Sequence, residues 1–87
     1  MTLDELKAEL RITTTDLDDV LEPMLVGIQA EARQFLGCVA LPDEPDIRQG
    51  LVMLARAQFD AAGPDEAMKF RRVAETLLQP HRMGMGL

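Results

Sequence analysis

Residues 17–36 carry the clearest periodic pattern in the sequence. Apolar side chains recur there at three- and four-residue intervals, which places them on one face of an α-helix and does not fit the two-residue alternation of a strand. The stripe consists of Leu17, Val20, Leu21, Met24, Leu25, Ile28, Ala32, Phe35 and Leu36. The pattern predicts one long amphipathic helix that starts at residues 15–16 and ends at Gly37. Because Pro23 lacks a backbone donor, we expect either a bend at residues 19–22 or a later start.

Three further segments have helical patterns, and no segment favours a strand. Thr2 and Glu5 have the spacing of a capping box, which predicts a short first helix ending near Arg11. A third helix is expected from Asp46 to Ala61. A Gly-Pro-Asp-Glu run then predicts the start of a fourth helix, whose inward side is expected to hold Ala67, Phe70, Val73, Ala74, Leu77 and Leu78. We therefore expect an all-α fold, a small bundle of about four helices over residues 1–79, followed by a mobile C-terminal tail over residues 80–87.

The third predicted helix is apolar on more than one side. One stripe holds Ile47, Leu51, Leu54, Ala55 and Ala62, and a second apolar set lies off that stripe, at Val52, Met53, Ala57 and Phe59. A bundle of 87 residues is expected to cover only part of such a helix, so neighbouring subunits would cover the remainder. The residues predicted to contact other subunits on this ground are Val26, Val52, Met53 and Phe59.

Composition favours assembly with other proteins over catalysis or DNA binding. The net charge of −6 argues against tight binding to a phosphate backbone. The single Cys38 excludes an intramolecular disulfide, and one Cys with one His does not make a four-ligand zinc site. Of the devices that stabilise small domains, oligomerisation remains. The chain also lacks an apolar run of about 20 residues and a basic leader followed by an apolar segment, so we expect no membrane association.

Catalytic and metal-binding motifs are missing from the sequence. It has no Gly-rich phosphate loop, no H-E-x-x-H pair and no Ser at all, which excludes the G-x-S-x-G elbow. Cys38 with His81 could form a nucleophile and base, but Cys38 follows the end of a helix, which is not the end that activates a thiol. Three acids at residues 16–19 lack the Gly and the final Glu of a calcium loop, and helix capping explains them better. We predict no enzyme activity and no cofactor.

Two surface features suggest contacts with other chains. Lys69 and Arg72 project away from the apolar stripe of the fourth helix, where they are either solvated or contact the acidic residues 16–19 of another copy. The tail is either disordered or orders on docking to a partner. The residues that would dock are Pro80, His81, Arg82, Met83, Met85 and Leu87.

The order of these features along the chain resembles a known family. The front of the chain reads T-L-D-E-L-K-A-E-L-R-I, with Leu3, Leu6, Lys7, Leu10, Arg11 and Ile12 as its most specific positions. Asp16 and Asp19 open the long helix, and the end reads L-L-Q-P-H-R, with Leu77, Leu78, Pro80 and Arg82. Over nearly its whole length the chain resembles the head-tail connector proteins of tailed bacteriophages, of the head-completion or DNA-packaging adaptor type.

This resemblance implies a structural role in the virion neck, after assembly in the host cytoplasm. Such proteins form a ring, commonly of twelve copies, beneath the portal protein, and the ring continues the DNA channel towards tail or stopper proteins. DNA would pass through without specific binding. Two other classes stay open: a helix-turn-helix regulator, which the apolar third helix and the acidic charge disfavour, and a small bacterial adaptor or antitoxin that binds one protein partner.

Overall fold

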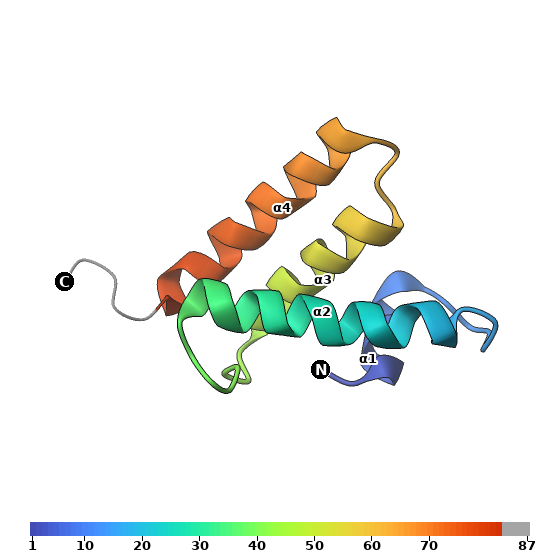
Figure 1. Ribbon diagram of the computed structural model, residues 1–87, viewed down its shortest axis with the longest axis horizontal. Coiled ribbons are helices and arrows are strands. Elements are labelled where there is room, and N and C mark those ends of the chain that lie inside the picture. Colours follow the sequence, from blue (N-terminus) through green and yellow to red (C-terminus); the bar gives the residue numbers. More distant parts are fainter. Residues whose placement is uncertain (83–87) are drawn as a thin grey trace.

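The computed structural model describes residues 1–82, and these form four α-helices and a terminal 3-10 turn (Figure 1). The elements are α1 (Leu3–Leu10), α2 (Asp18–Leu36), α3 (Pro45–Phe59), α4 (Pro64–Leu78) and η1 (Gln79–His81). No strand occurs among the described residues, so the predicted all-α class is confirmed.

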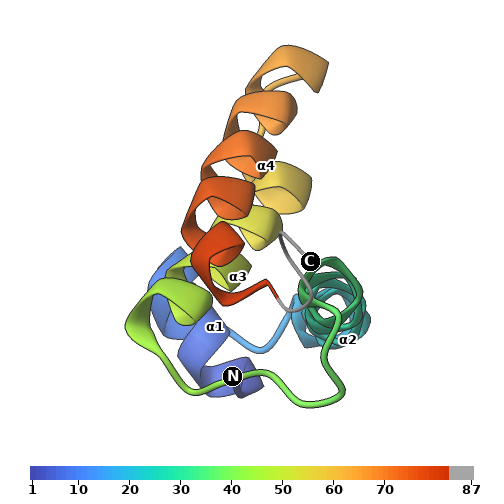
Figure 2. The same ribbon diagram turned by 90° about the vertical axis from the view of Figure 1, so that its left-hand side faces the viewer.

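The helices form a base and a projecting hairpin. α3 and α4 run antiparallel and pack against each other along their length, and α1 and α2 cross the lower part of α3 (Figures 1 and 2). The far end of the hairpin extends beyond the base, which makes the molecule elongated, with principal extents of 45 × 28 × 19 Å. α3 is therefore the central element of the fold, in contact with each of the other three α-helices.

The caps of α1 and the end of α2 follow the sequence signals. The backbone N–H of Thr2 donates to Glu5 Oε1 at 2.8 Å and that of Glu5 donates to Thr2 Oγ1 at 3.2 Å, which confirms the capping box. The bond from the Thr2 backbone is the main reason that the pKa of Glu5 lies below its usual value. Arg11 and Gly37 end α1 and α2 in the left-handed conformation, with φ of 60° and 72°.

The start of α2 differs from the expected one. The helix begins at Asp18, so Pro23 is its sixth residue, and only the bond to the Asp19 carbonyl is lost. Leu17 precedes the helix and is exposed. Val20 was expected in the core but is 58% exposed, because it comes one residue before buried Leu21 and therefore points about 100° away from it.

The core is aliphatic and lies where the other three α-helices meet α3. It includes Leu6, Leu25, Ile28, Ala32, Leu36, Ile47, Leu51, Leu54, Ala55, Ala74 and Leu78. Gly50 of α3 marks the closest approach of the hairpin helices, since a Cβ added there would lie 2.8 Å from Leu78 Cδ2. Val73 of α4 was expected to face inward but is 47% exposed, one residue before buried Ala74.

Candidate assembly surfaces

Part of the apolar surface of α3 that was expected to contact other subunits is covered within the chain. Val52, off the main stripe, is only 1% exposed, and it lies on the side of α3 that faces α1, since Arg48 and Arg56, one turn before and after it, bind Glu5 and the Glu9 carbonyl. Met53 is half-buried and packs against the core, and Phe59 is half-buried at the end of the helix. Val52 therefore cannot contact another subunit in this fold, and Met53 contributes mainly to the core.

The outer face of α2 is the first apolar surface that the fold leaves open. Val26 and Val20 are 62% and 58% exposed, and they lie on the two flanks of the outer side of α2, about 120° apart around the helix. Asp19 and Glu22 flank these valines and are exposed. Among the described residues neither acid has an ion-pair partner, whereas the neighbouring Asp18 accepts from Lys7 Nζ at 2.8 Å. We call Asp19, Val20, Glu22 and Val26 the α2 patch.

The outer face of α4 is the second such surface, and its charges are mixed, since the exposed Asp65 and Glu75 lie on it beside Lys69 and Arg72. Met68 is 54% exposed and lies on the same side of the helix as Lys69, Arg72 and the partly exposed Val73. Residues 67–74 contain three basic residues and no acidic one. Arg71 points inward and binds Glu31 of α2 at 2.6 Å, while Lys69 and Arg72 have no ion pair within residues 1–82. We call Met68, Lys69, Arg72 and Val73 the α4 patch.

The C-terminal turn is part of the fold. His81 Nε2 lies 2.7 Å from Asp46 Oδ2 in the first turn of α3, and the hydrogen bond from His81 is the main reason that the pKa of Asp46 lies below its usual value. The guanidinium of Arg82 lies 5.2 Å from the centre of the Phe35 ring, within cation–π range. The fold thus continues three residues past the boundary expected at residue 79. Of the predicted docking residues, Pro80 and Arg82 are exposed and His81 is half-buried.

The remaining predicted docking residues, Met83, Met85 and Leu87, lie outside the described part of the chain.

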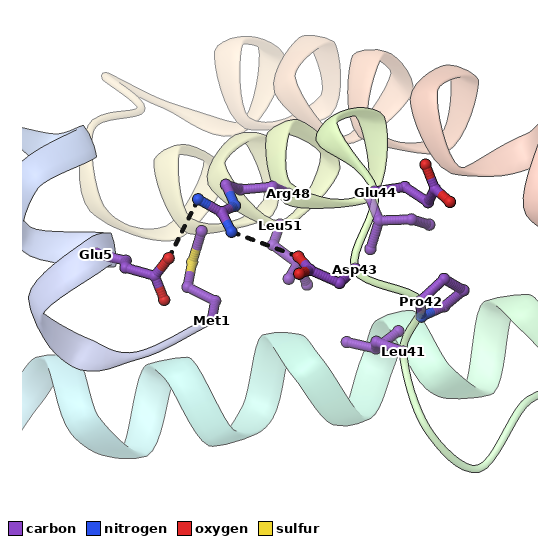
Figure 3. Close-up of a pocket in the computed structure, with 9 residues that line it drawn as sticks. Met1, Glu5, Leu41, Pro42, Asp43, Glu44, Arg48 and Leu51 are labelled. Carbon is purple, nitrogen blue, oxygen red and sulfur yellow. Dashed lines mark hydrogen bonds and ion pairs between the residues drawn. The ribbon is translucent and has the colours of Figure 1, made fainter.

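A hollow of about 320 Å³ lies between the N-terminus, the loop before α3 and α3 itself (Figure 3). At its wall, Arg48 bridges two acids, with Nη1 at 3.1 Å from Glu5 Oε2 and Nη2 at 3.4 Å from Asp43 Oδ1. Both ends of the guanidinium are therefore engaged within the chain. The hollow links three segments of the fold and offers a ligand no unpaired cation from Arg48.

Cys38 and His81 do not form a nucleophile–base pair among residues 1–82. Cys38 is half-buried against the core, and His81 is bound to Asp46. No group of three His, Cys, Asp or Glu side chains within residues 1–82 could hold a metal ion. None of the helices in the same part of the chain is long and apolar enough to cross a membrane.

Comparisons of the chain with family models, with curated proteins and with solved structures find no match. The interpretation of the two patches therefore depends on their own geometry and on the sequence features described above. Sequence reasoning had named Val26, Lys69 and Arg72 as contact residues, and all three are exposed. It had missed Val20 and Val73, which periodicity assigned to the core, and Met68.

Proposed function

We propose that this protein is a structural head-tail connector subunit of a tailed bacteriophage, a prophage or a phage-like particle. Copies assemble as a ring beneath the portal protein and extend the DNA channel towards the tail. The observation that carries the proposal is the order of features along nearly the whole chain, from the capped T-L-D-E-L-K-A-E-L-R-I helix to the closing L-L-Q-P-H-R turn.

Features of the folded chain are compatible with this role. The all-α chain has exposed apolar residues on the outer faces of α2 and α4, which suits a protein whose contacts are with other subunits. Its net charge of −6 suits a channel wall along which DNA slides, because such a wall offers few contacts that neutralise phosphates. The role requires no reaction, cofactor or membrane.

Native mass spectrometry tests the proposal directly. The purified protein is measured over a range of concentrations, alone and with capsids that carry a portal but no tail. Rings of about the portal's copy number, or saturable binding to the portal vertex, are the expected results. A stable one-to-one or two-to-two complex with a single partner, with no affinity for capsids, would instead support a small bacterial adaptor or antitoxin.

A second measurement addresses the channel. Fluorescence anisotropy with labelled duplex DNA at moderate salt should detect no tight binding by the protein or its ring, since phosphate affinity depends on clustered basic residues. Tight binding under these conditions would contradict a sliding channel, even if rings form.

A further inference from the structure

We infer that two copies of this chain associate through the outer face of α2, with the two helices antiparallel and related by a two-fold axis close to Val26. The occupant of this face is therefore a second copy of the same chain. The inference goes beyond the connector role, because a ring is built from contacts between unlike surfaces, whereas a two-fold dimer joins one surface to itself.

The outer face of α2 is open and nearly flat. α2 lies at one edge of the molecule, with the other helices on its inner side (Figures 1 and 2). A Cβ at Gly27 would meet no atom within 4 Å in the described part of the chain, so a second helix can come close there. The exposed residues of this face are small, apolar or uncharged: Pro23, Val26, Gly27, Ala30 and Gln34.

The charges of α2 indicate which partner fits this face. Of its five charged residues, two are bound within the chain to basic residues of α1 and α4. The other three, Asp19, Glu22 and Arg33, have no ion pair within residues 1–82. Arg33 follows Glu22 by about three helical turns, which places both on the same side of α2 but roughly 16 Å apart along its axis. They are therefore too far apart to pair within one helix.

An antiparallel second copy pairs these charges. The two acids lie in the first half of α2, and Arg33 lies in its last turn. With the two-fold axis just after Val26, Arg33 of each copy comes level with Asp19 and Glu22 of the other. The contact forms twice, once on each side of the axis, and Val26 meets its own counterpart between the two. A parallel partner in register would instead place acids beside acids and align the two helix dipoles, and both effects are unfavourable.

The size of the face sets the expected affinity. One helix face per subunit buries less area than a standard protein interface of about 1,600 Å². We therefore expect a reversible dimer with a Kd between about 1 µM and 1 mM.

Charge reversal tests the inference by sedimentation velocity. R33E leaves only unpaired acids on the outer face of α2 and D19K/E22K leaves only bases, so each variant alone should dimerise at least about tenfold more weakly than the wild type. An equimolar mixture should form one-to-one heterodimers, because acidic faces then meet basic ones. R72E makes the same charge change on the exposed face of α4 and should dimerise like the wild type. Circular dichroism verifies folding, and recovery in the mixture excludes misfolding as the cause of the loss.

A cross-linking experiment tests the orientation. In a C38A background, V26C lies close to the axis and should form a disulfide-linked dimer under a mild thiol oxidant. Q34C is exposed on the same face but should not cross-link, because the antiparallel arrangement places its two copies roughly 20 Å apart along the helices.

Three outcomes would overturn the inference. The first is a wild-type protein that stays monomeric up to about 1 mM, and the second is an R33E variant that dimerises like the wild type. The third is equal cross-linking by V26C and Q34C, which would indicate a parallel pair. None of these outcomes bears on the connector role, which binding to portal-bearing capsids tests separately.

Discussion

α3 and α2 both carry apolar residues outside their main stripe, and the fold treats the two sets in opposite ways. Val52 of α3 is 1% exposed, whereas Val26 of α2 is 62% exposed. The difference does not come from the residue type, which is the same. It comes from the tertiary arrangement, because α1 packs over the side of α3 that holds Val52, whereas the side of α2 that holds Val26 is left exposed.

The comparison shows what an apolar helix implies about assembly. A helix that is apolar on several sides needs cover, but a neighbouring segment of the same chain can supply that cover. Here α1 covers the side of α3 that holds Val52, and α4 covers the side that holds Gly50 while its own outer face stays exposed. The surface available for assembly is thus displaced from α3 to the outer sides of α2 and α4.

The largest effect is expected from placing a charge at the two matched valines. V52D places a carboxylate in the buried contact between α1 and α3, which should destabilise the fold by more than about 3 kcal/mol and leave little folded protein. V26D should change the free energy of unfolding by no more than about 0.5 kcal/mol, because Val26 is exposed on α2 and Val and Asp have similar helix propensities. Urea denaturation followed by circular dichroism measures both.

The same pair of variants separates folding from assembly. V26D should keep the wild-type unfolding curve but weaken the self-association proposed above, since it replaces an exposed apolar side chain of the α2 patch with a third acid. If V52D remained folded and lost only association, the burial of Val52 between α1 and α3 would be contradicted.

The second effect concerns one glycine on each of these helices, Gly27 of α2 and Gly50 of α3. A Cβ at Gly50 of α3 would lie 2.8 Å from Leu78 Cγ and Cδ2, whereas a Cβ at Gly27 of α2 would meet nothing within 4 Å. G50A should therefore destabilise the fold by about 1–3 kcal/mol through overpacking. G27A should stabilise it by about 0.5–1 kcal/mol, because Ala is the better helix former. Thermal unfolding of dilute samples measures both changes.

Equal stabilisation by both substitutions would show that the hairpin helices are not as closely packed as described. A loss of stability in G27A would instead show that the outer face of α2 is covered by something in the dilute protein.

Local sequence signals predicted the helices well, and tertiary contacts explain the differences. The capping box at Thr2, the stop at Gly37 and the Pro64 start all lie where expected, since each depends on residues close in sequence. The cover of Val52 depends on the packing of α3 against α1, two helices that lie far apart in the sequence. Val20 and Val73 were assigned to the core because a broad stripe at 3.6-residue spacing includes residues about 100° away from its centre.

The C-terminal turn was missed for a similar reason. Two glycines and a proline near the chain end favour a mobile tail in the sequence. The partners that hold the turn are Asp46, 35 residues before His81, and Phe35, which lies on another helix. No periodic pattern connects such positions. The adjacent His81 and Arg82 are the only sequence signal for these contacts, and they do not identify the partners.

The third effect concerns the ends of α1 and α2, which adopt the same left-handed conformation with different residues. At Gly37, substitution by Ala should cost about 1 kcal/mol, because a Cβ is unfavourable at φ of 72°. At Arg11, whose φ is 60°, substitution by Gly should relieve that strain and roughly offset the entropy that Gly adds to the unfolded chain, so its net effect should lie between zero and about 1 kcal/mol of stabilisation. Chemical denaturation measures both, and destabilisation by R11G would indicate that the Arg11 side chain makes a contact that outweighs its strain.

The smallest effect concerns the end of the hairpin where η1 lies against the first turn of α3, through the contact of His81 with Asp46. Because the pKa of Asp46 is lowered in the folded state, chiefly by the hydrogen bond from His81, its contribution to stability is fully present above the ordinary carboxylate pKa of about 4. That contribution is lost as the pH falls through the lower, folded-state value. Thermal unfolding between about pH 2 and pH 6 should therefore show a shallower acid dependence for D46N than for the wild type, whereas D16N, at an exposed acid outside the helices, should keep the wild-type dependence. H81Q should reduce the acid dependence in the same direction as D46N. If D46N and the wild type lost stability in parallel over this range, the turn would not be held to α3 by this pair, and the end of the hairpin would be as open as the outer faces of α2 and α4.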